Sequence, residues 1–196
     1  LAIQVEPAEA PEGRPVEYRA LFVNQNGESA GGSLNWFHCS ARKPSAELGP
    51  VSQECFDGKS DKLASIGRGL TVSGTVPRTA CSLFGPKPPI LYNTDGPPGR
   101  PADPDGTGGY KQPVVLGVAA DDGTRSTVLY EQRVQCGLAG VSAKISKEYN
   151  DRYRNNVNPQ VTSIEVERGS GEKLSVVDGT VLDAYRPPLA RPVRLI

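Results

Sequence analysis

Two strands and the turn between them decide the fold: Val114-Val-Leu-Gly-Val-Ala-Ala120, Asp121-Asp-Gly123, and Ser126-Thr-Val-Leu-Tyr-Glu-Gln-Arg-Val-Gln-Cys136. The first run is almost entirely apolar, as expected of a strand at the centre of a sheet. Asp-Gly is a hairpin signal. Alternation in the return strand places Val128, Tyr130, Val134 and Cys136 on one face. This stretch predicts an antiparallel β-domain.

Earlier stretches add strands to this hairpin. Ala2–Glu6 alternates and stops at Pro7, which predicts a first edge strand, and 69–73 predicts a short one. Residues 16–23 form another strand, with Val16, Tyr18, Ala20 and Phe22 sharing a face. Residues 33–39 form a further strand that carries the only tryptophan, Trp36, which we expect in the core of a β-sandwich.

Residues 40–66 are polar and irregular, and 77–112 are rich in proline and glycine. Proline donates no backbone hydrogen bond, so neither a helix nor a central strand fits the second stretch. Loops of this length are uncommon and are usually functional or mobile. We expect an ordered excursion from the sandwich over 82–110 that contacts a partner.

The pattern changes period after the hairpin, because Val141, Ile145, Tyr149 and Tyr153 recur every four residues among polar ones. This predicts an amphipathic linker helix within 139–158 that Tyr149 and Tyr153 seat on a domain. A strand at 161–167 follows.

The expected organisation is a β-sandwich over 1–138, the linker over 139–158, and 159–196 as a partial second β-domain or a docking tail. Ile164-Glu-Val-Glu167 resembles Ile3-Gln-Val-Glu6, which favours a second, similar domain. The chain opens on a strand-like segment without methionine, so we expect a mature or truncated product.

Composition limits the function classes. Lys plus Arg and Asp plus Glu number 22 each, and this neutral balance gives no support to nucleic-acid binding. No apolar run reaches the ~18 residues of a membrane span. Four cysteines without a CxxC or metal-like spacing indicate disulfides and a secreted, periplasmic or cell-surface setting.

Four cysteines allow several pairings. We favour Cys39–Cys55 and Cys81–Cys136, because each bridge then ties a poorly structured stretch to the end of a strand. The alternative, Cys39–Cys136 with Cys55–Cys81, looks more like the inter-sheet bridge of antibody domains.

Candidate chemistry is sparse. His38 is the only histidine, and it alternates with Cys39 along one strand, so their side chains are expected to point apart. The segment that contains Asp103 and Asp105 superficially resembles an EF-hand calcium loop, but it lacks the terminal Glu of that loop. Tyr92 and Tyr110 are candidate binding residues for carbohydrate or peptide; the alternative is that they pin the long segment to the sandwich. We expect no enzyme activity, metal or cofactor.

Parts of the chain also resemble a group of myxobacterial surface lipoproteins with immunoglobulin-like repeats. The resembling pieces are residues 1–13, Trp36-Phe-His-Cys39, 103–114 and the helix ending at Asn155-Asn-Val-Asn-Pro159. The resemblance covers most of 1–168. It implies an immunoglobulin-like β-sandwich, a helical linker and another sandwich, with a lipid anchor on an upstream cysteine outside this sequence. It supplies no catalytic residues, and it points to a structural module with other protein subunits as partners.

Overall fold

The computed structural model describes residues 1–23, 32–42, 51–86, 109–121, 123–160, 164–167, 173–176 and 194–195. The chain divides into two compact units, residues 1–157 and 158–196. Each unit is described by itself below.

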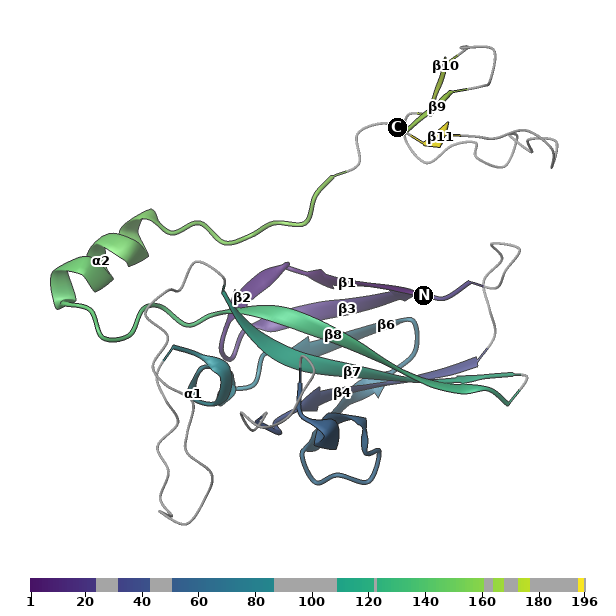
Figure 1. Ribbon diagram of the computed structural model, residues 1–196, viewed down its shortest axis with the longest axis horizontal. Coiled ribbons are helices and arrows are strands. Elements are labelled where there is room, and N and C mark those ends of the chain that lie inside the picture. The colour runs from purple at the N-terminus through teal and green to yellow at the C-terminus, as the bar shows by residue number, and fades with distance from the viewer. Residues whose placement is uncertain are drawn as a thin grey trace. The chain divides into compact units, whose positions relative to one another are not determined.

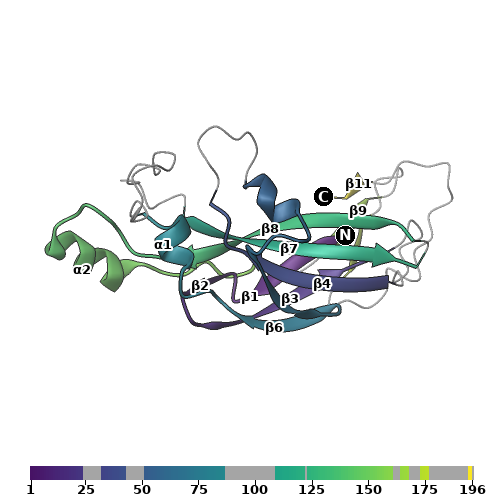
Figure 2. The same ribbon diagram turned by 90° about the horizontal axis from the view of Figure 1, so that it is seen from below.

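The first unit is a β-sandwich of two facing sheets (Figure 1). Its smaller sheet has three antiparallel strands in the order β1-β3-β6. The strands are β1 (Ala2–Glu6), β3 (Pro15–Leu21) and β6 (Thr71–Thr75). As predicted, β1 is an edge strand that ends before Pro7. Figure 2 shows this sheet as one layer, beneath the layer that contains β4, β7 and β8.

The larger sheet has five strands in the order β2-β8-β7-β4-β5. Its strands are β2 (Glu9–Pro11), β4 (Gly32–Cys39), β5 (Leu63–Arg68), β7 (Tyr110–Ala120) and β8 (Arg125–Gln135). The short β2 pairs parallel to β8, and the other neighbours are antiparallel. The predicted hairpin of β7 and β8 is therefore confirmed, and β7 lies inside the sheet as its apolar run indicated.

Side chains from both sheets fill the space between the layers. Trp36 and Tyr18 are fully buried, with ring centroids 5.7 Å apart, and the Trp36 indole N–H donates to the carbonyl of Gly69 at 2.8 Å. Alternate side chains along each strand point into the space between the sheets and form the rest of the core, as the sequence predicts. The core face of β3 carries Val16 and Tyr18, and that of β8 carries Val128, Tyr130, Val134 and then Cys136.

A second, smaller core lies on the outer face of the larger sheet. Val115 of β7 packs there with Val51 and with the buried pair Cys39 and Cys55. Cys55 belongs to a short 3-10 helix, η1 (Gln53–Phe56). Because β7 is covered on both faces, its sequence is apolar without alternation.

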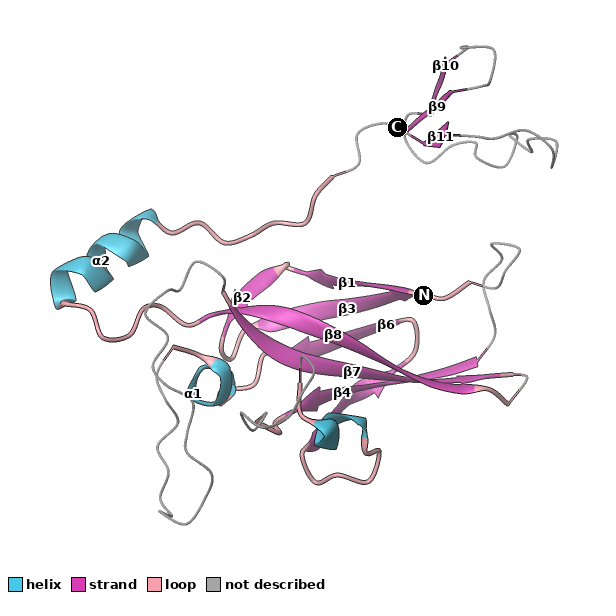
Figure 3. Cartoon of the chain, viewed as in Figure 1, coloured by secondary structure: helices cyan, strands magenta, loops and turns pink. Residues whose placement is uncertain are grey.

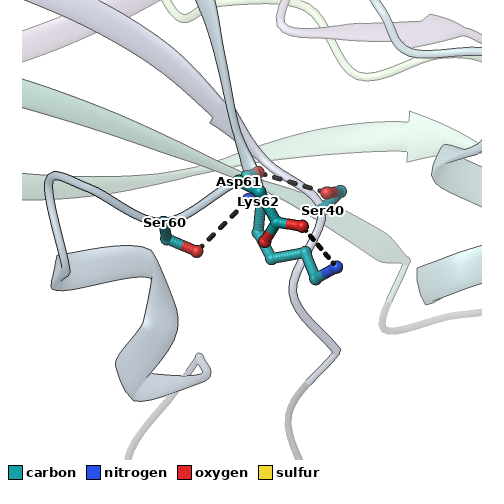
Figure 4. Close-up of polar contacts among 4 residues, drawn as sticks. All are labelled: Ser40, Ser60, Asp61 and Lys62. Atoms are coloured by element: carbon teal, nitrogen blue, oxygen red, sulfur yellow. Dashed lines mark hydrogen bonds and ion pairs between the residues drawn. The ribbon is translucent and has the colours of Figure 1, made fainter.

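A group of polar contacts lies beside this second core, just before the start of β5 (Figure 4). The Ser40 backbone N–H and hydroxyl both donate to the carbonyl of Lys62, at 2.9 and 3.1 Å. The Lys62 N–H donates to the Ser60 hydroxyl at 3.2 Å, and its ammonium lies 3.4 Å from the Asp61 carboxylate. These contacts join the end of β4 to the segment that leads into β5.

Two segments differ from the prediction. Strand β5 begins within 40–66, which was expected to be irregular throughout. Pairing with β4 supplies backbone hydrogen bonds there, although the sequence has no clear strand pattern. A short helix, α1 (Ala80–Phe84), and the first residues of β7 lie within 77–112. Both fall outside the proline-dense centre of that segment, so the prediction of no helix or central strand was wrong at its ends.

The amphipathic helix is confirmed as α2 (Ala143–Arg152), which is shorter than the predicted 139–158 segment (Figure 3). Ser142 caps it by accepting from the Ile145 N–H at 3.4 Å. In the second unit, β9 (Ile164–Glu167), β10 (Lys173–Val176) and β11 (Arg194–Leu195) form a sheet in the order β10-β9-β11. Among the described residues, no helix has the length and apolar character needed to cross a membrane.

Candidate functional site

Two disulfides fasten covering segments to the ends of strands. Cys39 at the end of β4 bonds Cys55 of η1, and Cys81 of α1 bonds Cys136 just after β8, with S–S distances of 2.10 and 2.11 Å. This is the pairing that the sequence analysis favoured. The antibody-like alternative, which would have joined Cys39 to Cys136, is not present.

The start of the long 77–112 segment is tied to the sandwich at several points. The Cys81 N–H donates to the Glu12 carboxylate at 2.6 Å, and the Gly85 N–H donates to the Cys81 carbonyl at 2.9 Å. Cys81 itself also packs against the main core. The segment is therefore anchored to the sandwich at Cys81, while 87–108 lie outside the described residues.

Of the two candidate binding tyrosines, Tyr110 lies within the described residues and Tyr92 does not. Tyr110 is only 6% exposed and sits at the start of β7, opposite Val134 of β8. A buried side chain presents little surface to a carbohydrate or peptide, so its position corresponds to the alternative role of pinning the segment. Tyr92 lies outside the described residues, as do Asp103 and Asp105. Within the described ranges, no group of three His, Cys, Asp or Glu residues is placed to hold a metal ion.

His38 belongs to a polar group buried between the two sheets. The Tyr18 hydroxyl donates to the Gln132 side-chain carbonyl at 2.5 Å and lies 2.8 Å from Nε2 of His38. The Tyr18 hydroxyl has a single proton, which it donates to Gln132. The hydrogen bond between Tyr18 and His38 therefore needs a proton on Nε2 of His38, which donates to the Tyr18 oxygen. Burial lowers the pKa of His38 to about 4, so the ring is neutral at physiological pH. Cys39, its neighbour, faces the opposite side of the sheet, as predicted.

The most elaborate polar site surrounds Glu9 of β2, whose side chain is 1% exposed. One carboxylate oxygen accepts from the Tyr153 hydroxyl. The other accepts from the Asn156 backbone N–H at 2.9 Å and its side-chain amide at 3.0 Å, and lies 3.3 Å from Nε of Arg133. This site was not predicted from the sequence, because Glu9 and Asn156 are 147 positions apart and no local pattern connects them.

The pKa values of Arg133 and Tyr153 are consistent with this arrangement around Glu9. Burial alone lowers the pKa of Arg133, but a hydrogen bond to Tyr153 and the negative charge of Glu9 outweigh burial, so that pKa is raised. Partial burial and the hydrogen bond to Glu9 raise the pKa of Tyr153 to about 12. Tyr153 is therefore a protonated donor, and Arg133 a permanent cation, at any physiological pH.

A hollow of about 390 Å³ lies along α2 beside the Glu9 site. Its lining combines apolar and aromatic side chains with an ion pair between Glu148 and Arg152, whose charged atoms are 3.0 Å apart. It is lined by Leu138, Ile145, Glu148, Tyr149, Arg152 and Tyr153. Tyr149 and Tyr153 stack with centroids 4.9 Å apart, so these two tyrosines shape one wall of the hollow while Tyr153 also bonds the sandwich.

Comparison with known proteins does not extend this picture: no protein-family model, curated protein or solved structure matches the chain.

Proposed function

We propose that the chain is a non-enzymatic structural and interaction module of a bacterial cell-surface or periplasmic protein, acting as a subunit of a larger assembly. In this proposal other protein subunits are the partners, and a membrane is reached only through a lipid anchor outside this sequence. The proposed module is the immunoglobulin-like β-sandwich of residues 1–157, followed by a second β-unit.

Strand order supports the immunoglobulin-like assignment. In the immunoglobulin scheme one sheet contains strands A, B and E, and the other contains G, F and C, extended by C′ in variable-type domains. The order β1-β3-β6 matches the first set, and β8-β7-β4-β5 matches the second. Trp36 on β4 then occupies the strand that carries the core tryptophan of antibody domains. The disulfides depart from that scheme, since neither joins the two sheets.

The observation that carries the proposal is the pair of disulfides on the sandwich. Disulfides persist in oxidising compartments, which fits a protein that works outside the reducing cytosol. Both bridges hold covering segments against strand ends, so they stabilise the shape of a surface. A surface stabilised in this way, on the first of two consecutive β-units, supports a role in binding other proteins.

Thiol trapping in intact cells tests the compartment. We expect an alkylating reagent, added before lysis, to label none of the four cysteines unless a reductant is present. Non-reducing peptide mapping should then recover Cys39 linked to Cys55, and Cys81 linked to Cys136. Full alkylation of the four cysteines without reductant would contradict the proposal.

The alternative function, carbohydrate or peptide binding through 77–112, relies on exposed aromatic side chains in that segment. Burial of Tyr110 removes one of the two aromatics named for it. A glycan and peptide panel against the isolated protein distinguishes the two functions, because tight binding by the monomer would favour the alternative.

A further inference from the structure

The buried carboxylate of Glu9 has an unusual set of partners for a group with no assigned role. Three of its contacts come from one short segment after α2, through Tyr153 and Asn156, and the fourth comes from Arg133 on the neighbouring strand β8. We infer that Glu9 is a latch that docks the strap of residues 153–156, and with it helix α2, onto the sandwich.

The cost of burying a charge explains why the strap stays docked. A carboxylate removed from water is strongly destabilised unless donors replace its hydration. Arg133 supplies a positive charge at 3.3 Å, and the strap supplies three donors: an aromatic hydroxyl, a backbone N–H and a side-chain amide. Hydrogen bonds to an ionised acceptor are about twice as strong as those between neutral groups. The docked strap is therefore the state in which Glu9 is satisfied.

The helix itself depends on this latch. It has 10 residues and buries none of them, and Ile145 on its apolar face is 49% exposed. A helix of this length is marginal on its own in water. Its Ser142 cap and its i,i+4 ion pairs, such as Lys147–Asp151 at 2.7 Å, contribute locally but do not hold it to the sandwich. Tyr153 caps the end of α2 and bonds Glu9, so it joins the helix to the latch.

Gly109 shows that the latch is built into the fold. Its φ is +71°, and a Cβ added there would lie 2.4 Å from Cζ of the Arg133 guanidinium. Any other residue would displace the side chain that pairs with Glu9. The start of β7 thus leaves room for the cation of the latch.

The latch fixes where the part of the chain docked on the sandwich ends. Strap residues up to Asn156 belong to the body of the sandwich, while Val157, the next residue, is 83% exposed. The latch makes α2 and residues 153–156 an extension of the module, so that any swivel in the linker begins after Asn156. This consequence does not depend on the proposed function.

Amide hydrogen exchange and limited trypsin digestion test the latch in the full chain. In the native protein, the Asn156 amide lies outside regular structure, yet we expect it to be protected because it donates to Glu9. Trypsin sites after Arg152 and Arg154 should be cut slowly. In Glu9→Gln, the Asn156 exchange rate and the cleavage rate at both sites should rise about 10- to 100-fold, since a bond to a charged acceptor is lost.

Glu131→Gln is the matched control, because it removes a partly exposed carboxylate of β8 that pairs with Lys111 at 3.1 Å, away from Glu9. It should leave both readouts at native values. Amides of β7 report whether the sandwich remains folded. If Glu9→Gln unfolds the whole unit, the Tyr153→Phe variant tests the latch instead, since it deletes one donor to Glu9 and no core contact. It should raise the Asn156 exchange rate and the trypsin cleavage rate while the amides of β7 stay protected.

Two results would overturn the latch. One is an Asn156 amide in the native protein that exchanges as fast as in an unstructured peptide. The other is equal trypsin cleavage after Arg152 and Arg154 in the native protein and in both latch variants.

Discussion

His38, buried between the two sheets with Tyr18 and Gln132, makes the sandwich sensitive to acid. Its pKa is about 4 in the folded protein, against 6.5 for an exposed imidazole. Below pH 6.5 the unfolded chain binds a proton that the folded chain does not, so the free energy of unfolding falls as the pH falls. The loss is complete near pH 4, where it reaches about 3 kcal/mol, and above pH 6.5 it is absent.

Urea denaturation followed by Trp36 fluorescence measures this effect. His38→Gln cannot titrate, so subtracting its stability from that of the native protein cancels the carboxylates common to both. The difference should decline by about 3 kcal/mol between pH 6.5 and 4. Parallel stability curves for the two proteins over that range would show that His38 does not carry the acid sensitivity.

At the scale of single elements, strand β6 packs so closely on its neighbours that it requires a glycine. A Cβ on Gly74 would lie 2.8 Å from Cγ2 of Ile66 and 3.1 Å from Cε2 of Tyr18. Gly74→Ala should therefore lower the free energy of unfolding by about 1–3 kcal/mol. Thermal or urea denaturation measures the change.

Gly58→Ala is the control for that substitution, because nothing lies within 4 Å of its added Cβ. It should change stability by less than about 0.5 kcal/mol. Equal stability of the two variants would mean that the space around Gly74 is less restricted than the structure indicates.

The elements that could be predicted from the sequence are those with a strong local pattern. Strands β7 and β8 follow from an apolar run, an Asp-Gly turn and an alternating return strand, and α2 follows from its four-residue period. Strand β5 has no such pattern, since it is stabilised by pairing with β4 at a sheet edge. Helix α1 has five residues, and the bridge from Cys81 to Cys136 holds it in place rather than helix propensity.

The site around Glu9 could not be predicted for a related reason. Each of its strap contacts joins residues more than 140 positions apart, and neither Tyr153 nor Asn156 stands out beyond the helix pattern. The disulfide pairing was predictable because both bridges lie at strand ends that the sequence does reveal. Burial of Tyr110 was not, because the start of β7 was assigned to the long segment.

Across the whole first unit, the two disulfides differ in protection from solvent. Cys39 and Cys55 are both fully buried, whereas Cys81 and Cys136 are only partly buried. We expect a mild reductant to open Cys81–Cys136 first, as measured by alkylation and mass spectrometry over time. That bridge spans 55 residues, and its loss should destabilise the unit by about 4 kcal/mol, against about 3 kcal/mol for the 16-residue bridge.

Reduction of Cys39–Cys55 before the other bridge would contradict this order. Replacing each pair by alanines provides the matched variants for the stability comparison, since each leaves the other bridge intact.

The division of the chain at residue 157 predicts that the first unit folds alone. It contains both disulfides, both sheets of the sandwich and the whole Glu9 latch. A chain of residues 1–157 should show the same urea midpoint by Trp36 fluorescence as the full chain. A chain ending at residue 152 loses the strap and should unfold at a lower urea concentration than 1–157.

The central claim, that this disulfide-bonded sandwich serves in an assembly outside the cytosol, is tested most directly by cross-linking in intact cells. The reagent should join lysines and be unable to cross the cytoplasmic membrane, and mass spectrometry should identify the linked peptides. We predict links from exposed lysines of the first unit, such as Lys59 and Lys111, to peptides of other proteins. Absence of any label on the chain in intact cells, or links confined to the chain itself, would contradict the claim.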